Sequence, residues 1–443
     1  MFQLLTVVSL IVLVCINSTS AAIFADGEYD RLKTVMNSFQ CLGICDKYEL
    51  PRFSSCETEL LLTNWLVCDD EGYVIKLALN RNFRGILSTG ISELTRLQYF
   101  SLSLNLGYVS RVPWNSLVTM TNLTALHMTA NTITGSIPSE IGQMSSLTSL
   151  LLKNNEFDSS IPSEIGLLTN LEQIDLSVTQ IEGTLPVPLF NLQNLKELIV
   201  VKTKIVGGIP SECGNLKSLQ TLNLFDSEFL EGTIPSEVGL LTELDYFNVE
   251  HTNMIGTVPS EFGLLHKLTD LLLSRNGFTG TLDQFTTLTG LKKLQINTNN
   301  FTGSISTLFG SFSTLNSLQL SSNDLVSTIP TEIFGAQLID FGVGNNADIT
   351  GTIPTEVANS PYLTGLSVSD NKIEGTIPTE LGSTTRLRTL QVSNNNLVGT
   401  LPSELHMITR LTALYVDGNA LTGEFYYKPY FRGCRVYSSD KLD

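Results

Sequence analysis

The sequence predicts an α/β repeat solenoid, in which short parallel strands line one face and short helices or 3₁₀ turns line the opposite face. Two observations support this. The octapeptide GSIPSEIG, which begins at Gly135, returns with small changes about every 24 residues. A second pattern, L-x-x-L-x-L-x-x-N, precedes each copy. A unit this short cannot bury its apolar face alone, so consecutive units must stack on one another.

The strand pattern occurs fifteen times, with spacings of 23 to 26 residues. Alternation in its L-x-L core directs one side chain inward and the next outward. The Asn that closes most units is expected to be buried and to bond backbone groups of adjacent coils. Thr179, Thr203 and Thr252 replace it in three units and can form only part of that hydrogen bonding. The predicted units begin at Val74, Leu97, Leu123, Leu147, Leu171, Leu195, Leu219, Leu244, Leu268, Leu291, Leu315, Leu338, Leu363, Leu387 and Leu411.

The recurring I-P element predicts a short helix or 3₁₀ turn on the side opposite the strands. Proline fixes φ and lacks an N–H donor, which suits the entry to a helix. The Ser or Thr and the Glu that follow suit its first turn through capping and the helix dipole. The resulting column of nine glutamates, from Glu140 to Glu404, is either a set of solvated helix starts, which we favour, or a cation-binding ladder. Units nine and ten lack the proline, which predicts a less regular face there.

The combined pattern L-x-x-L-x-L-x-x-N-x-L-x-G-x-I-P-x-x-[IVL]-G-x-L resembles the plant-type subclass of leucine-rich repeats. That subclass occurs in the ectodomains of receptor-like kinases, in receptor-like proteins and in polygalacturonase-inhibiting proteins. The resemblance runs from about Val74 to Gly423. The segment WLVCDDEGYV from Trp65 is similar to the family's N-terminal cap, although the usual glycine after the tryptophan is missing. The resemblance implies a horseshoe or superhelix, with the parallel sheet on the concave face, the short helices on the convex face and a second short sheet beside the first.

The predicted organisation is a signal peptide at 1–22, a Cys-containing cap at 23–73, the repeats at 74–424 and an aromatic C-terminal cap or tail at 425–443. The apolar stretch near the start is thirteen residues long, too short to span a bilayer. Ser20-x-Ala22 suits a signal-peptidase site. No later apolar run has membrane-spanning length. We therefore expect a secreted or cell-surface protein without a transmembrane segment of its own.

Cysteines and sequons agree with an extracellular environment. The cysteines ahead of the repeats predict two disulfides, in any one of three connectivities. Cys213 is expected to be a buried thiol, and the state of Cys434 is left open. Asn122 and Asn300 begin Asn-x-Thr sequons and are candidate glycosylation sites. The disulfide candidates are Cys41, Cys45, Cys56 and Cys68.

The bulk charge and the scattered histidines exclude several classes of function. The net charge is −17 and the pI is about 4.7, which disfavours binding to nucleic acid or to anionic membranes. The four histidines fall in different units without metal-ligand spacing. Neither a nucleophile elbow nor a phosphate-binding loop is present. The sequence thus predicts no enzyme, no metal and no cofactor.

The outward strand positions of units four to nine predict a ligand-binding patch on the concave face. Apolar and aromatic residues rimmed by charges are typical of recognition sites. We expect Phe225, Tyr246 and Leu272 to anchor the ligand. Asp226, Glu250 and Arg275 would supply orienting charges. The predicted patch comprises Leu151, Asp175, Ile199, Val201, Phe225, Asp226, Tyr246, Glu250, His251, Leu272 and Arg275.

This patch predicts an extracellular recognition module that binds a protein, a peptide or a glycan, in a receptor-like signalling or defence role. A membrane co-receptor is a further expected partner. Two alternatives stay open. One is a secreted inhibitor of a cell-wall-degrading hydrolase, which the resemblance to polygalacturonase-inhibiting proteins implies. The other is a structural or adhesion protein.

Overall fold

The computed structural model describes residues 30–31, 34–35, 66–71, 73–80, 87–105, 111–346, 348–422 and 435–437. The chain divides into two compact units, 1–219 and 220–443, each of which is considered by itself. The predicted signal peptide, Cys41, Cys45, Cys56 and Cys434 lie outside the described residues. So do most of the two predicted caps.

The first unit is a stack of coils whose strands form a parallel sheet. At the start of this sheet, β1 pairs with β2 in an antiparallel arrangement. Every later pairing is parallel and in the register predicted from the leucine pattern: Leu77, Phe100 and Leu126 are successive partners. The strands are β1 (Leu66–Cys68), β2 (Val74–Ala78), β3 (Tyr99–Ser101), β4 (Ala125–His127), β6 (Ser149–Leu151), β8 (Gln173–Asp175) and β10 (Glu197–Ile199).

The second unit repeats this architecture. Its parallel register passes through Leu222, Phe247 and Leu271 and continues to Leu414. β30 then adds a further parallel strand beside β28. The strands are β12 (Thr221–Asn223), β14 (Tyr246–Asn248), β16 (Asp270–Leu272), β18 (Lys293–Gln295), β20 (Ser317–Gln319), β22 (Asp340–Gly342), β24 (Gly365–Ser367), β26 (Thr389–Gln391), β28 (Ala413–Tyr415) and β30 (Arg435–Tyr437).

A second set of short parallel strands runs beside the main sheet in each unit, as the family resemblance implied. In the first unit these strands are β5 (Thr134–Gly135), β7 (Glu156–Phe157), β9 (Glu182–Gly183) and β11 (Lys204–Ile205). In the second unit they are β13 (Glu231–Gly232), β15 (Asn253–Thr257), β17 (Gly277–Thr281), β19 (Asn300–Gly303), β21 (Asp324–Thr328), β23 (Asp348–Thr350), β25 (Glu374–Gly375), β27 (Asn396–Gly399) and β29 (Ala420–Leu421).

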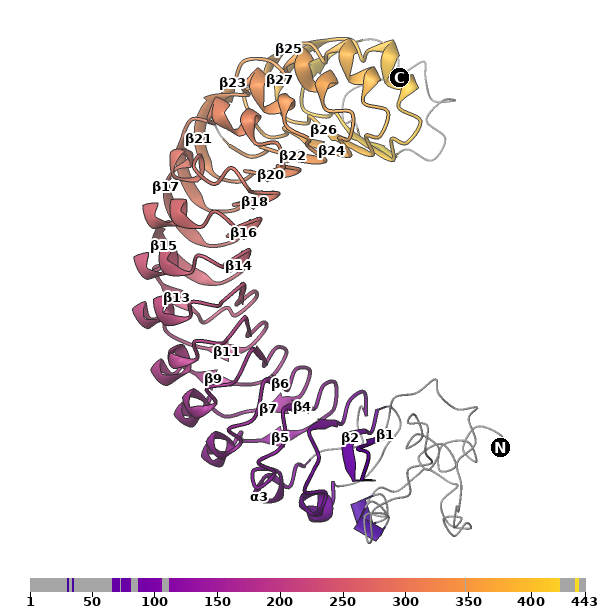
Figure 1. The fold of residues 1–443 in the computed structure, drawn as a ribbon. Coiled ribbons are helices and arrows are strands. Elements are labelled where there is room, and N and C mark those ends of the chain that lie inside the picture. Colours follow the sequence, from indigo (N-terminus) through magenta and orange to yellow (C-terminus); the bar gives the residue numbers. More distant parts are fainter. Residues whose placement is uncertain are drawn as a thin grey trace, which may run out of the picture. The chain divides into compact units, whose positions relative to one another are not determined.

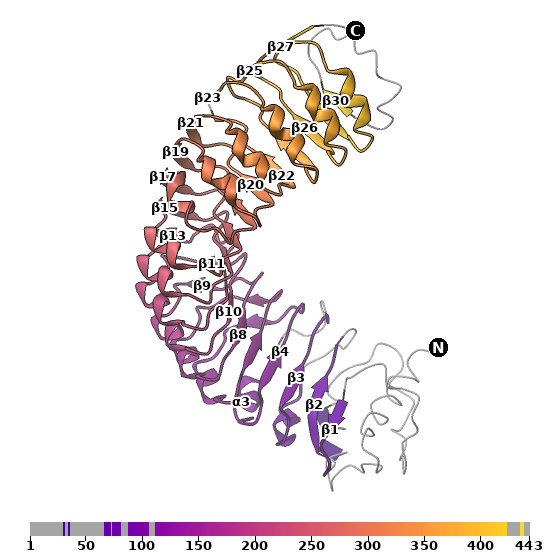
Figure 2. The same cartoon turned by 45° about the horizontal axis from the view of Figure 1, so that its top comes forward.

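Short helices line the side of each unit opposite the main sheet, as Figures 1 and 2 show from two directions. Of the helices described on this side, all but α3 are 3₁₀ helices. The first unit has η2 (Thr89–Glu93), α3 (Trp114–Leu117), η3 (Ser139–Gln143), η4 (Ser163–Leu167), η5 (Val187–Asn191) and η6 (Ser211–Asn215). The second has η7 (Ser236–Leu240), η8 (Ser260–Leu264), η9 (Leu282–Phe285), η10 (Thr307–Ser311), η11 (Thr331–Gly335), η12 (Thr355–Asn359), η13 (Thr379–Ser383) and η14 (Ser403–Met407).

The I-P element starts these helices in a different way from the predicted capping. Pro138 occupies the N-cap position of η3, where its carbonyl accepts the Ile141 N–H at 3.1 Å and no side chain caps the helix. The Ser or Thr hydroxyl instead donates to the Glu that follows it, in all nine coils of the glutamate column. Proline is dispensable, because η9 and η10 form without it; Ser306 caps η10 by accepting the Leu308 N–H.

The core of each coil is closed by the side chain that ends the strand pattern, which we call the ladder position. At Asn323, Nδ2 donates to the Leu320 carbonyl of its own coil and to the Ile296 carbonyl of the preceding coil, both at 3.0 Å. Its Oδ1 accepts the Phe301 N–H at 3.1 Å. Asn131, Asn155, Asn276, Asn299, Asn346, Asn371, Asn395 and Asn419 donate across coils in the same way. Each asparagine thus joins two coils as well as closing one.

The residue just before the ladder position has a left-handed backbone in nearly every described coil, and we call it the left-handed position. Its φ lies between 52° and 65°, and only Gly418 among these residues is a glycine. A left-handed backbone is uncommon for other residue types. Each such residue turns the chain out of the main sheet, so its side chain stands at the edge of the sheet.

Candidate ligand-binding site

The predicted patch is divided between the two units. Leu151, Asp175 and Ile199 of the first unit are partners in consecutive strands, and Val201 follows two residues later. Asp175 is buried, contrary to the prediction of an exposed ligand-binding charge. It accepts the Ser177 N–H at 3.1 Å and pairs with Lys153 Nζ at 2.9 Å. Asp175 therefore completes the strand end and is satisfied within the protein.

In the second unit, Phe225 and Tyr246 are both partly exposed; Tyr246 lies on β14 and Phe225 two residues beyond the end of β12. Asn223 Oδ1 accepts the Phe225 N–H at 3.2 Å. Asn248 Nδ2 donates to Tyr246 Oη at 3.0 Å, and Asn248 Oδ1 accepts the Glu250 N–H at 2.9 Å. The asparagines that end β12 and β14 therefore fix the backbone and the ring of the partly exposed residues.

Leu272, the third predicted anchor, is 7% exposed and offers almost no surface to a ligand. Its strand partners are Asn248 and Gln295. Parallel strands lie only about 4.8 Å apart, so the side chains of the flanking coils cover a residue between them. Exposure at an outward position therefore depends on the neighbouring coils, which a single strand pattern does not reveal.

Glu250 is partly buried on the same face. Burial raises the pKa of its carboxyl above the ordinary value, while a hydrogen bond from the Ser274 backbone and the charge of Arg275 oppose that shift. A carboxylate held in a partly desolvated position favours a ligand that brings positive charge or hydrogen-bond donors.

Asp226, His251 and Arg275 occupy left-handed positions, with φ of 58°, 55° and 58°. The prediction that these side chains lie on the strand face was therefore wrong, because the turn places them at its edge. Strand stacking brings them together: they come from three consecutive coils. His251 Nδ1 hydrogen-bonds Asp226 Oδ1, and His251 Nε2 lies 3.8 Å from Glu228 Oε1.

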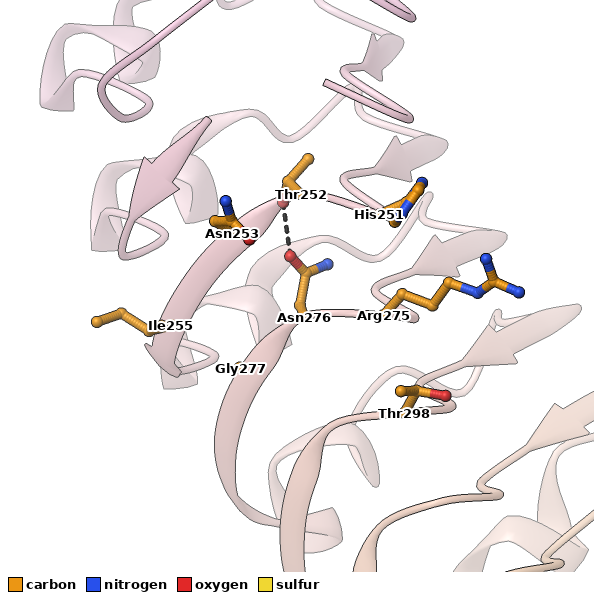
Figure 3. A pocket seen from close by; sticks show the side chains of 8 residues that line it. All are labelled: His251, Thr252, Asn253, Ile255, Arg275, Asn276, Gly277 and Thr298. Carbon is orange, nitrogen blue, oxygen red and sulfur yellow. Dashed lines mark hydrogen bonds between the residues drawn. The ribbon is translucent and has the colours of Figure 1, made fainter. Parts of the chain in front are cut away.

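A groove of about 630 Å³ adjoins this edge of the second unit. Figure 3 shows His251, Arg275 and Thr298, one from each of three consecutive coils, along one side of it. Ile255, 55% exposed, lies on the other side, on β15. Asn276 and Thr252 lie between them and are joined by a 2.6 Å hydrogen bond. The groove offers one apolar contact, one cation and several polar groups within a single recess.

The sequence analysis missed Glu228, Ile255, Asn276 and Thr298 as site residues. Asn276 contacts Thr252, 24 residues earlier in the chain, and Thr298 lines the groove one coil beyond Arg275. The signal for Glu228 was present, because an extra residue lengthens its coil. Comparing left-handed positions from coil to coil would also have paired Asp226 with His251.

The first unit contains a histidine in a contrasting setting. His127 lies on the sheet face, where its Nδ1 is 3.1 Å from Tyr99 Oη and its Nε2 is 2.9 Å from Ser149 Oγ. Burial lowers its pKa. With hydroxyl partners at both ring nitrogens, His127 is held as a neutral part of the sheet face.

The candidate modification sites are placed as follows. Cys68 on β1 is disulfide-bonded. Asn122 and Asn300 are exposed, and Asn122 Nδ2 donates to the Thr95 carbonyl of the preceding coil. Cys213 is buried in η6. In the described part of the chain, no helix is long and apolar enough to cross a bilayer.

Comparison with known proteins agrees with this architecture. A model of the leucine-rich repeat family matches residues 362–384 and 386–407. No curated protein matches the chain. Among solved structures, the chain is similar to the plant peptide hormone receptor RGFR1 in complex with RGF2, at 26% identity and a TM-score of 0.71, over 82% of this chain and 62% of that one.

Two further structures extend the comparison. The ectodomain of the Arabidopsis receptor kinase HAESA, in complex with an IDA peptide hormone lengthened at its N-terminus, is 29% identical with a TM-score of 0.74, over 82% of this chain and 60% of that one. A leucine-rich repeat protein of Leptospira interrogans is 27% identical with a TM-score of 0.60, over 82% and 83%. This chain therefore spans less than two thirds of the two plant receptors.

The stacked coils, with one parallel sheet, a short second sheet and 3₁₀ helices opposite, define a leucine-rich repeat solenoid, a fold that serves as a ligand-binding module. The chain contains leucine-rich repeats and is similar in structure to plant leucine-rich repeat receptors.

Proposed function

We propose that this protein is an extracellular recognition module that binds a peptide or a peptide-like segment of another protein. The segment would lie across the main sheet of the second unit, between Phe225 and the groove beside Arg275. The observation that supports this most is the pair of partly exposed aromatic rings, Phe225 and Tyr246, on the same unit as that groove. Rigid aromatic side chains beside polar recesses are the usual anchors of an interface.

The charges around these rings favour a ligand with mixed polarity. Glu250 and Asp226 would receive its donors, and Arg275, which is exposed, would pair with a carboxylate. The two plant receptors to which the chain is similar were solved with peptide hormones. A peptide in extended conformation can cross several coils, each contributing one or two side chains.

An extracellular location is part of the same proposal. The apolar segment within residues 1–22 supports secretion, and the disulfide at Cys68 supports an oxidising compartment. Exposed sequons at Asn122 and Asn300 are compatible with glycan attachment. Mass spectrometry of the protein recovered from culture medium would test this: we expect an N-terminus at Ile23 and a mass shift on glycosidase treatment.

The binding surface can be tested by affinity capture from native extracellular material, followed by affinity measurement with the captured partner. The test variant is Phe225→Ser with Tyr246→Ser. The matched control is Tyr415→Ser, which removes a ring from the same sheet seven coils beyond Tyr246. Loss of an anchor typically costs about 2 kcal/mol or more, which is about 30-fold in affinity. Equal affinity for the test and control variants would contradict the proposed surface.

The identity of the captured partner separates the remaining possibilities. A secreted peptide or a receptor fragment supports the receptor-like role. A hydrolase whose activity falls on binding would instead support an inhibitor.

A further inference from the structure

The groove beside Arg275 lies where one side chain is missing from the second, short sheet. In that sheet, an exposed residue of one strand has as its partner the first residue of the next strand. Ile255 on β15 is paired in this way with Gly277 on β17. In the other such pairs that the structure describes, the partner carries a side chain. These partners are Glu156, Lys204, Asn253, Asn300, Asp324, Asp348, Asn396 and Ala420.

The glycine is matched to the isoleucine beside it. Gly277 does not have a left-handed backbone, so its conformation alone does not require glycine. A Cβ at this position would lie 2.9 Å from Ile255 Cγ2, which is closer than two carbon atoms can pack. Because that Cβ is absent, Ile255 stays 55% exposed and forms an apolar wall of the groove. Figure 3 shows Arg275 on the other side, with Gly277 between the two.

The groove combines this apolar wall with a cation. Within the described part of the chain, no carboxylate forms an ion pair with Arg275. Three carboxylates stand nearby but do not line the groove. Asp226 and Glu228 lie beside opposite ring nitrogens of His251. Glu250 is close enough to Arg275 for their charges to interact. These carboxylates would repel an anion, so the groove favours a neutral group that can contact a guanidinium.

We propose that the groove receives an aromatic side chain of the bound peptide, with the ring between Ile255 and Arg275. The inference rests on the proposed function, which supplies the peptide. The face of an aromatic ring attracts a guanidinium without carrying a net charge, and the rest of the ring would be buried against Ile255. The chain makes the same contact itself: the Arg386 guanidinium lies 4.8 Å from the centroid of the Tyr362 ring.

The size and the position of the groove suit such a side chain. Its volume of about 630 Å³ falls within the range of small-ligand sites, about 300–1,000 Å³. Because His251 and Arg275 come from the edge of the main sheet, a peptide that crosses this sheet can place one side chain over its edge. The groove would thus select an aromatic residue at one position of the peptide.

The groove can be probed with N-acetyl amides of single amino acids, which require no captured peptide. Saturation-transfer NMR with the intact protein would compare the tyrosine, phenylalanine, leucine and glutamate amides. We expect both aromatic amides to bind about two- to fivefold more tightly than the leucine amide, the effect of one exposed cation–π contact. The glutamate amide should bind most weakly. Arg275→Asn, which introduces the residue found at this position as Asn345 and Asn394, should remove the preference for a ring.

A second variant fills the groove without disturbing the fold. Ile255→Thr with Gly277→Asn reproduces the threonine–asparagine pair of the next coil, so the sheet already accommodates this arrangement. Val398→Thr with Ala420→Asn is the matched control, because it makes the same replacements at the equivalent pair of another coil. We expect the filled variant to lose aromatic amide binding and the control to retain it.

The outcomes separate this inference from the proposed function. Aromatic amides that bind the wild type no better than the leucine amide would overturn the inference. Equal binding by the filled variant and its control would also overturn it, since the ring would then lie elsewhere. If aromatic amides bind the groove as expected while the captured partner binds the Phe225→Ser, Tyr246→Ser variant with unchanged affinity, the groove is supported and only the proposed sheet surface is contradicted.

Discussion

Two groups of coils within the second unit differ in how they close. From Asn276 to Asn419 the ladder position is asparagine, and each side chain bonds its own coil and the preceding one. Ser227 and Thr252 stand there in the two coils before. The Thr252 hydroxyl contacts the Val249 carbonyl of its own coil, at 3.0 Å, and Asn276 Oδ1 of the next coil, at 2.6 Å. It does not bond the preceding coil, as the Nδ2 of an asparagine does.

The candidate site coincides with this gap in the ladder. Asp226 and His251 directly precede Ser227 and Thr252, and Glu228 directly follows Ser227. A ladder side chain shorter than asparagine lacks the amide that bonds a carbonyl of the preceding coil. The two coils of this edge therefore close without the asparagine amide that joins the regular coils to one another. The predictions below test that comparison, beginning with the largest effect.

The regular coils should depend strongly on the ladder. Asn323→Ala would leave the Ile296 carbonyl and the Phe301 N–H without their buried partner. An unsatisfied buried group costs about 1–3 kcal/mol, so we expect a loss of about 3 kcal/mol in the free energy of unfolding. Urea denaturation followed by circular dichroism measures it. Thr252→Ala is the comparison at the same position in the gap and should cost about 1 kcal/mol. Equal losses would show that the two groups of coils close in equivalent ways.

Restoring the asparagine should strengthen the gap. Thr252→Asn places an Nδ2 donor where it can reach back to the coil that begins at Leu219, as Asn276 reaches the Val249 carbonyl. One added hydrogen bond contributes about 0.5–1.5 kcal/mol, so we expect a gain of that size in urea denaturation. Thr252→Asp is the matched control, because it has the same shape and lacks the donor. A gain in both variants, or in neither, would contradict the hydrogen-bonding explanation.

The sequence predicts those features that depend on a single coil, and it does not predict those that depend on neighbouring coils. The register of the sheet was predictable because every coil must bury its own leucines; Leu222, Phe247 and Leu271 are strand partners as expected. The burial of Leu272 was not predictable, since it depends on the side chains of the coils on both sides. The edge cluster depends on the left-handed backbone at Asp226 and His251. Residue type alone does not reveal it, because residues as different as Val178 and Arg275 adopt the same conformation in other coils.

The smallest expected effect concerns charge on the face next to the gap. Because burial raises the pKa of Glu250, the folded state holds this proton to higher pH than the unfolded chain does. The contribution of Glu250 to stability is therefore most favourable at low pH and declines as pH rises from the ordinary glutamate value, about 4.3, through the raised value in the folded state.

Glu250→Gln removes this penalty, so its unfolding free energy at pH 7 should exceed that of the wild type by about 0.5 kcal/mol or less, the size typical of substitutions near the surface. The difference should shrink as the pH approaches 4. Paired urea titrations at several pH values measure it, with Glu374→Gln on β25 as a control for the general loss of negative charge from an acidic protein. A difference that persists unchanged at pH 4 would assign the effect to altered hydrogen bonding with the Ser274 backbone. The carboxylate of Glu250 would then be as well accommodated as that of an exposed glutamate, and its proposed role in receiving a donor from the ligand would lose its electrostatic basis.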